Sequence, residues 1–171
     1  MSFEMGSVLS GREIREMVLG GKLVREYLDL DTQLTPNGFD LSLREIHAFK
    51  DPGYVDFSNK SRHVSETEPL DFEQKLFLNP GAYKIVYNEI VDLPNDILAI
   101  GRTRSTLLRC GTSVVSAVFD AGYVGRCESL LIVSNPHGFV LEKDARVLQL
   151  IFLKLSSSSE GYSGVYKGEN I

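Results

Sequence analysis

The chain has 171 residues, of which 43% are hydrophobic and 24% charged, and its formal net charge is −5. This composition fits one globular domain with its own core, and the acidic balance without a large basic patch excludes a protein that follows a nucleic-acid backbone. Because the sequence has no run of about 18 apolar residues and no secretory leader, we expect neither a membrane span nor export.

The first expected element is a short helix that starts after Ser10. Ser10 and Glu13 have the spacing of a capping box, in which each residue satisfies a main-chain N–H of the other. Apolar residues then recur at helical spacing, and residues 20–21 are both glycine, which ends helices. The segment 22–30 is ambiguous between helix and strand.

The remainder of the domain is expected to be short strands. Residues 35–38 form a turn signal, and residues 39–43 alternate with a period of two, which predicts a half-buried strand over 39–46. Residues 51–75 are polar and predict a long loop. Further strands, separated by turn residues, are expected at 76–78, 82–87, 91–93, 97–100 and 147–155. Short strands at this spacing predict an all-β sandwich, barrel or jelly roll.

The most informative segment is residues 118–125, V-F-D-A-G-Y-V-G, between the apolar runs 113–117 and 130–133. Gly122 and Gly125 permit positive φ, so the segment predicts a tight β-hairpin with Asp120 near its turn. One interpretation is a turn chosen for conformation alone, since Asp and Gly are common there. The other is a ligand-binding turn, in which backbone groups hold a small ligand and the Asp120 carboxylate takes part in the reaction.

A cluster of arginines follows the strand at 97–100, namely Arg102, Arg104 and Arg109. It is either a solvated face or a binding site for a small polyphosphate. The three histidines are scattered and predict no metal site. Cys110 and Cys127 are expected to be free thiols that pack in the interior, which indicates a reducing, cytoplasmic location.

The C-terminal segment differs in composition from the rest of the chain. Residues 156–159 are all serine, and residues 161–168 are rich in glycine, with Tyr162, Tyr166 and Lys167. We therefore divide the chain into a β domain over 1–155 and a flexible tail over 156–171. The tail is either a disordered end or a lid, in which tyrosine stacks on a ring and lysine meets a phosphate.

Taken together, several segments in order resemble motifs of the superfamily of dCTP deaminases and trimeric dUTPases. They are residues 37–41 (NGFDL), 101–109 (GRTRSTLLR), 120–125 (DAGYVG), 145–150 (ARVLQL) and 162–168 (YSGVYKG). The resemblance implies a distorted β jelly roll that acts as a homotrimer, with active sites between subunits. It also implies a deoxyribonucleoside triphosphate as the substrate.

By similarity to the dUTPases, Asp120 positions the water that attacks the α-phosphorus, and Tyr123 packs beneath the deoxyribose. Mg²⁺ is implied as a cofactor bound mainly through the nucleotide phosphates, with no protein metal ligand. The similarity further implies that the remaining substrate contacts come from the arginine segment, the strand at 145–150 and the tail. These residues are Arg104, Ser105, Arg109, Gln149, Tyr166 and Lys167. Lys167 is either a contact of the γ-phosphate or a solvated terminal charge.

Deamination of dCTP is the alternative chemistry of the same scaffold. The deaminases use a glutamate ten positions after the hairpin aspartate, and this chain has Leu130 there. Glu128 would share a strand face with Leu130 and replace the glutamate only if the register shifted. Val118 stands where the deaminases carry an arginine.

We therefore expect a deaminase-like dUTPase that lacks the deaminase glutamate and converts dUTP to dUMP and pyrophosphate. One alternative is a dCTP deaminase, which would convert dCTP to dUTP or, if bifunctional, to dUMP. The other is a homologue that binds nucleotides without turning them over. The choice between uracil and cytosine is left open, because backbone groups of the hairpin can also read the base edge.

Overall fold

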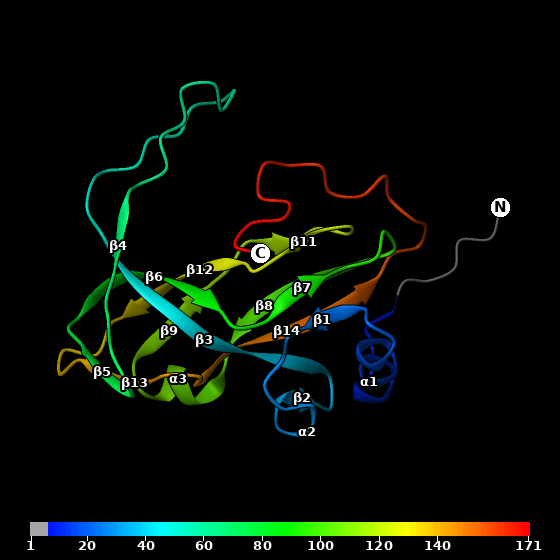
Figure 1. The fold of residues 1–171 in the computed structure, drawn as a ribbon, viewed down its shortest axis with the longest axis horizontal. Coiled ribbons are helices and arrows are strands. Elements are labelled where there is room, and N and C mark those ends of the chain that lie inside the picture. The colour runs from blue at the N-terminus through cyan, green and yellow to red at the C-terminus, as the bar shows by residue number, and fades with distance from the viewer. Residues whose placement is uncertain (1–6) are drawn as a thin grey trace.

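The protein is mostly β, and the computed structural model describes residues 7–171 (Figure 1). Its main unit is a curled antiparallel sheet of nine strands with the order β10-β8-β14-β3-β6-β12-β9, and β2 and β4 also pair with β3. The strands of this sheet are β2 (Leu34–Thr35), β3 (Gly38–Phe49), β4 (Thr67–Pro69), β6 (Gly81–Tyr87), β8 (Ile97–Thr103), β9 (Thr112–Val115), β10 (Val118–Phe119), β12 (Glu128–Val133) and β14 (Arg146–Lys154).

Two small antiparallel sheets and three short helices complete the fold. One sheet contains β1 (Leu23–Arg25), β7 (Ile90–Asp92) and β11 (Val124–Gly125), and the other contains β5 (Lys75–Leu78) and β13 (Phe139–Glu142). The helices are α1 (Gly11–Leu19), α2 (Leu30–Gln33) and α3 (Ser105–Arg109). The expected all-β fold with a short N-terminal helix is confirmed, and residues 1–6 of the expected domain lie outside the described residues.

The N-terminal helix forms as its sequence signals predict. The main-chain N–H of Ser10 donates to Glu13 Oε2 over 2.8 Å, and the side chain of Ser10 accepts from the N–H of Glu13, so the capping box is present. Ile14 and Val18 are buried against the sheet, and Gly20 ends the helix. No helix within residues 7–171 is long and apolar enough to cross a membrane.

Strand β3 departs from the predicted half-buried pattern, because its first half is buried on both faces. Asp40 and Ser42, which alternation places outside, are 2% and 0% exposed. Both are satisfied by polar partners: Arg104 Nε lies 2.9 Å from Asp40 Oδ2, and the N–H of Ser42 donates to Glu89 Oε2 over 2.9 Å. The polar face of β3 can therefore lie inside the protein, because its buried polar groups have hydrogen-bond partners.

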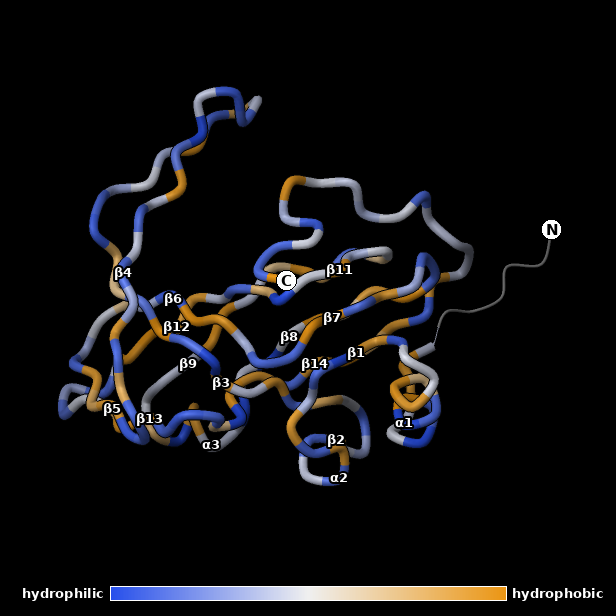
Figure 2. The backbone as a smooth tube through the Cα atoms, viewed as in Figure 1, coloured by the Kyte–Doolittle hydropathy of each residue, from blue (hydrophilic) through white to orange (hydrophobic). Residues whose placement is uncertain are grey.

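The polar segment predicted as a loop is an arm that projects from the β3–β4 end of the sheet (Figure 1). Its two sides meet at the bridge between Tyr54 and His63, and Asp51 at its base contacts His63 Nε2 over 2.5 Å. The loop prediction for 51–75 is confirmed except at the short strand β4 and at Lys75, where β5 begins. The hydropathy colouring shows mixed polar and apolar residues along this arm, whereas apolar residues are concentrated in the strands of the body (Figure 2).

The predicted hairpin is confirmed in its two apolar strands but is not tight close to its turn. Strands β9 and β12 do pair, with Leu130 opposite Val115. However, β10 pairs with β8 and β11 pairs with β7, so the two arms beside the turn separate instead of bonding to each other. The separation of these arms creates room between them, which a tight hairpin would have closed.

The turn itself forms where the glycines predict it, although only one glycine adopts positive φ. Gly122 has φ +81°, and the N–H of Tyr123 donates to the Asp120 carbonyl over 3.0 Å. Gly125 is not among the residues with positive φ, which corrects that expectation. A Cβ on Gly125 would lie 2.5 Å from Tyr123 Oη, so this glycine serves close packing.

Candidate functional site

A cavity of about 210 Å³ lies between the separated arms of the hairpin and the C-terminal tail. Asp120 stands exposed at its rim, and Tyr123, Glu128, Tyr166 and Glu169 contribute to its lining. Ligand pockets for compounds of drug size usually enclose at least about 300 Å³. A nucleoside triphosphate would therefore require the tail to move outward.

The ring of Tyr123 is the buried centre of this site. It packs edge-on against Phe119 at 6.0 Å and against Tyr162 of the tail at 5.7 Å between ring centroids. Burial raises the pKa of Tyr123 far above its usual value, with a further contribution from Cys127. The phenol therefore stays neutral and acts as a hydrogen-bond donor.

Residues 156–171 lie along the hairpin of their own chain without helix or strand (Figure 1). The N–H of Tyr162 donates to the Ala121 carbonyl over 2.8 Å, and the N–H of Gly168 donates to the Val124 carbonyl over 2.7 Å. A Cβ on Gly122 would lie 2.7 Å from the Cα of Gly161, so the glycine at the turn also allows the tail to approach.

Arg126, which the sequence analysis did not single out, fixes the end of the tail. Its side chain is buried, with Nη2 2.6 Å from Glu26 Oε2, and Nη1 donating to the Asn88 carbonyl. Its Nε donates to the Asn170 carbonyl over 3.2 Å, and its main-chain N–H donates to the Glu169 carbonyl over 2.9 Å. The only sequence signal was a charged residue placed among the apolar positions after the turn.

The side chain of Glu169 closes the cavity from the tail side. The hydroxyl of Tyr123 donates to Glu169 Oε1 over 2.6 Å. Burial raises the pKa of Glu169, and the Glu128 carboxylate raises it further, against the opposing effects of the Tyr123 hydrogen bond and the Lys84 ammonium. The docked tail therefore binds a proton at Glu169 more tightly than an undocked tail does.

This shift predicts that tail docking weakens as pH rises. The pKa is raised on docking, so docking is strongest below the ordinary value of 4.5 and is reduced as pH passes the raised value. We expect the hydrogen-exchange protection of the Gly168 amide to fall with rising pH, after correction for intrinsic exchange. Glu169→Gln should flatten this dependence, and an identical pH slope in both proteins would contradict the assignment.

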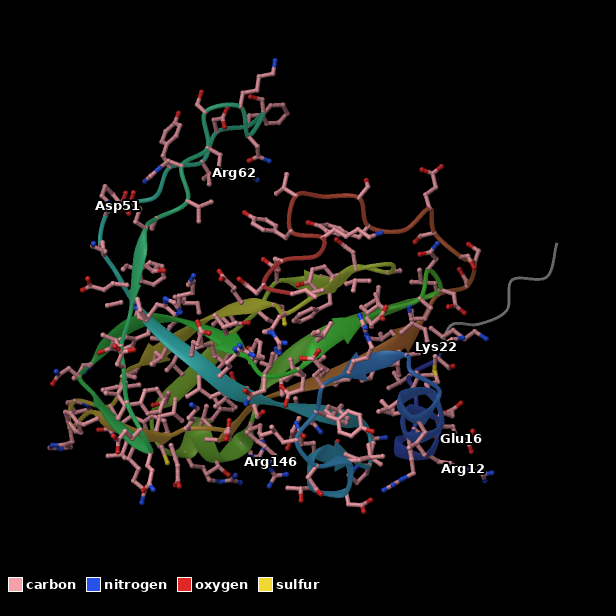
Figure 3. All side chains as sticks on the ribbon, viewed as in Figure 1. Arg12, Glu16, Lys22, Asp51, Arg62 and Arg146 are labelled. Atoms are coloured by element: carbon pink, nitrogen blue, oxygen red, sulfur yellow. The ribbon has the colours of Figure 1, made fainter. Side chains whose placement is uncertain are left out.

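Four residues expected to contact the substrate do not line this cavity. The guanidinium of Arg104 is held by the buried Asp40, and the side-chain amide of Gln149 donates to Thr35 Oγ1 over 2.5 Å. Ser105 and Arg109 are exposed on α3. Asp40 also contacts Arg146, with 3.2 Å between Arg146 Nη1 and Asp40 Oδ2. Figure 3 labels Arg146 and shows that it lies on the side of the body away from the tail.

The tail residues of the expected site lie beside the cavity. Tyr166 lines it, and the guanidinium of Arg62 on the projecting arm stands 5.7 Å from the centroid of this ring. Figure 3 shows Arg62 toward the outer part of that arm. The ammonium of Lys167 donates to the Tyr162 carbonyl over 3.0 Å, so it is engaged within the tail.

At the position of the alternative chemistry, Glu128 lines the cavity and Leu130 does not. The carboxylate of Glu128 accepts from Lys84 Nζ over 3.0 Å. Cys127 is also in the lining, and burial raises its pKa well above the usual value, so it packs as a neutral thiol. Within residues 7–171, no group of three or more side chains is arranged to hold a metal ion.

Comparisons with known proteins agree on one family. A family model described as dCTP deaminase-like matches residues 8–155. A protein of Archaeoglobus fulgidus, named "Probable deoxyuridine 5'-triphosphate nucleotidohydrolase", is 50% identical over 165 residues, which cover 96% of this chain and 98% of that protein. A protein of the same name from Methanococcoides burtonii is 48% identical over 169 residues, covering 96% and 99%.

Among solved structures, the 2'-deoxycytidine 5'-triphosphate deaminase from Agrobacterium tumefaciens matches with a TM-score of 0.70 at 23% identity. The match covers 88% of this chain and 49% of that chain, so this chain spans about half of the deaminase. At this identity the likeness concerns the overall fold alone.

Proposed function

Because this chain belongs to the dCTP deaminase-like family, we propose that it is a dUTP nucleotidohydrolase that converts dUTP to dUMP and diphosphate. The observation that carries the proposal is the near-complete match to relatives named for that activity. The test is the release of diphosphate from dUTP, with dCTP and ammonia release measured in parallel. Absence of diphosphate at saturating dUTP would refute the proposal.

The geometry of the cavity supports a role for Asp120 as the group that orients water. Its carboxylate is exposed at the rim, where it can accept a hydrogen bond from a water next to the substrate. The ring of Tyr123 is fixed from two sides by aromatic contacts and offers a flat apolar surface for a deoxyribose. Attack of the oriented water on the α-phosphorus would release diphosphate.

We propose that Mg²⁺ is a cofactor, bound mainly through the phosphates of the nucleotide. Magnesium in phosphate-transfer sites is commonly bound by one or two carboxylates together with substrate phosphates and waters. The exposed carboxylate of Asp120 at the rim is assigned to the attacking water, so the ion would take its ligands from the phosphates and from other waters. When bound, the ion would spread the charge on the triphosphate.

Deamination of dCTP is the second candidate, and the observation that favours it is the presence of Glu128 in the cavity lining. A carboxylate at this place could move a proton during attack at C4 of cytosine. Ammonia release from dCTP tests this candidate directly. Without ammonia at saturating dCTP, the candidate is abandoned.

We further propose that the active unit is a homotrimer. Arg104, Ser105 and Gln149, which are expected to bind phosphates, lie away from the cavity of their own chain, so a complete site would take them from another copy. Two exposed apolar residues at the edge of the cavity support this arrangement: Ile100 on β8 is 39% exposed, and Val118, its neighbour on β10, is 56% exposed and also lines the cavity. The unpaired cysteines agree with a cytoplasmic location.

The tail is proposed to act as a lid that opens for the substrate and then closes over it. Deleting residues 156–171 removes Tyr166 and Lys167 and opens the cavity to solvent. We expect kcat/KM for dUTP to fall by about 100-fold, since closing lids exclude water and position the substrate. Steady-state kinetics measures this loss, and a matched chain with residues 156–158 changed to glycine keeps Tyr166, Lys167 and the docking contacts of Ser159 as a control. Unchanged kcat/KM after deletion would contradict a lid.

A further inference from the structure

Glu128 lines the cavity and forms an ion pair with Lys84, which is not part of the lining. This pair has no part in the hydrolysis described above. Lys84 on β6 and Glu128 at the start of β12 meet at 3.0 Å between Nζ and Oε1. Their side chains are only 24% and 33% exposed. Fully exposed pairs contribute little to stability, and removing two charges from water carries a cost. Stability therefore does not explain this partly buried pair, and its place beside the cavity indicates a role in binding a ligand.

The tail shows that Glu128 accepts a hydrogen bond from an amide N–H. The side-chain amide of Asn170 donates from Nδ2 to Glu128 Oε1 over 3.3 Å and to the Arg126 carbonyl over 3.0 Å. The docked tail thus places an N–H attached to a carbonyl carbon against Glu128. The imide N3–H of uracil, flanked by carbonyls on both sides, is likewise an N–H donor next to a carbonyl carbon.

The order of residues along the cavity places the base near this pair. On the proposed function, the phosphates and sugar are at Asp120 and Tyr123, on the turn side of the hairpin. The strand leaving the turn continues through Cys127 to Glu128, which also line the cavity. A pyrimidine attached to a sugar over Tyr123 would extend toward Glu128 as Asn170 moves away.

We propose that Glu128 and Lys84 read the edge of the base and determine a preference for uracil over cytosine; this inference rests on the proposed function. Uracil presents an N–H at N3 for the Glu128 carboxylate, and either neighbouring carbonyl can accept from the Lys84 ammonium. Cytosine in the same pose turns the lone pair of N3 toward the carboxylate and its amino group toward the ammonium. Cytosine can hydrogen-bond to both Glu128 and Lys84 only if the ring moves sideways, so that its amino group faces Glu128. Uracil can hydrogen-bond to both with either of its carbonyls beside Lys84.

The test is the binding of dUMP and dCMP to Glu128→Gln, measured by calorimetry on the full-length protein. A glutamine can present either its carbonyl or its amino group, so it accepts both bases. We expect the ratio of the dCMP Kd to the dUMP Kd to fall by about 10- to 100-fold, the range for one charged hydrogen bond. The ratio of kcat/KM for dUTP and dCTP in diphosphate release should fall in parallel.

Three further variants separate base reading from other effects. Glu68→Gln makes the same change in the exposed pair with Lys50, at 3.8 Å and outside the cavity, and should leave the ratio unchanged. Asn170→Ala removes the contact to Glu128 from the tail side and should also preserve the ratio. Lys84→Met should weaken dUMP more than dCMP, which gives a second readout from the other half of the pair.

Two results would overturn the inference. One is an unchanged ratio in both Glu128→Gln and Lys84→Met, with circular dichroism showing folded protein. The other is ammonia release from dCTP that is abolished in Glu128→Gln, because Glu128 would then transfer protons in a deamination. If the wild-type protein releases no diphosphate from dUTP, the proposed function fails, while the preference between dUMP and dCMP still tests the reading of the base.

Discussion

Asp120→Asn should lower kcat for diphosphate release from dUTP by about 1,000-fold, within the range expected for loss of a general base. The amide keeps the size of the side chain but loses the charge that orients and polarises the attacking water. The turn should remain intact, because its hydrogen bond from the N–H of Tyr123 uses the Asp120 carbonyl and not the side chain. Single-turnover release of diphosphate measures the chemical step.

The matched control for this substitution is Asp71→Asn, an exposed aspartate outside the cavity, which should keep full activity. Binding of dUMP to Asp120→Asn should stay within about tenfold of wild type, since the carboxylate acts on water rather than on the base. A kcat within tenfold of wild type in Asp120→Asn would contradict the role assigned to this residue, whatever the effect on KM.

Ile100→Asp should dissociate the proposed trimer and reduce activity by about 1,000-fold. The substitution places a carboxylate in the apolar patch of Ile100 and Val118, where burial between copies would leave the charge unpaired. The separated chains would retain the cavity beside Asp120 but lose the phosphate contacts expected from a neighbour. Light scattering coupled to size-exclusion chromatography reports the mass, and diphosphate release reports the activity.

Val140→Asp provides the control for the assembly experiment. Val140 is 55% exposed on β13, and the same apolar-to-acidic change there should alter neither mass nor activity. The proposed arrangement would be contradicted if Ile100→Asp remained trimeric and active, or if the wild-type protein were a fully active monomer. Because Ile100 points outward while its neighbour Ala99 is buried, the free chain is expected to keep its fold.

Local signals in the sequence predicted those parts of the fold that depend on neighbouring residues. The capping box of Ser10 and Glu13 forms as its spacing indicates, and Gly122 adopts the positive φ that its turn requires. Strand β14 follows its apolar run to within one residue at each end. Each of these features depends on contacts within a few positions along the chain, which the order of residues specifies directly.

The sequence alone also determined the order of motifs that identified the family, including Asp120 and Tyr123 in one segment. It did not determine which strands the hairpin arms pair with, since β10 and β11 bond to β8 and β7. Residues of opposite charge gave no sign of their pairing: Arg126 and Glu26 are 100 positions apart, and Glu128 and Lys84 are 44 apart. Only the curled sheet and the docked tail bring such groups together, because contacts between distant positions arise from packing of the whole chain.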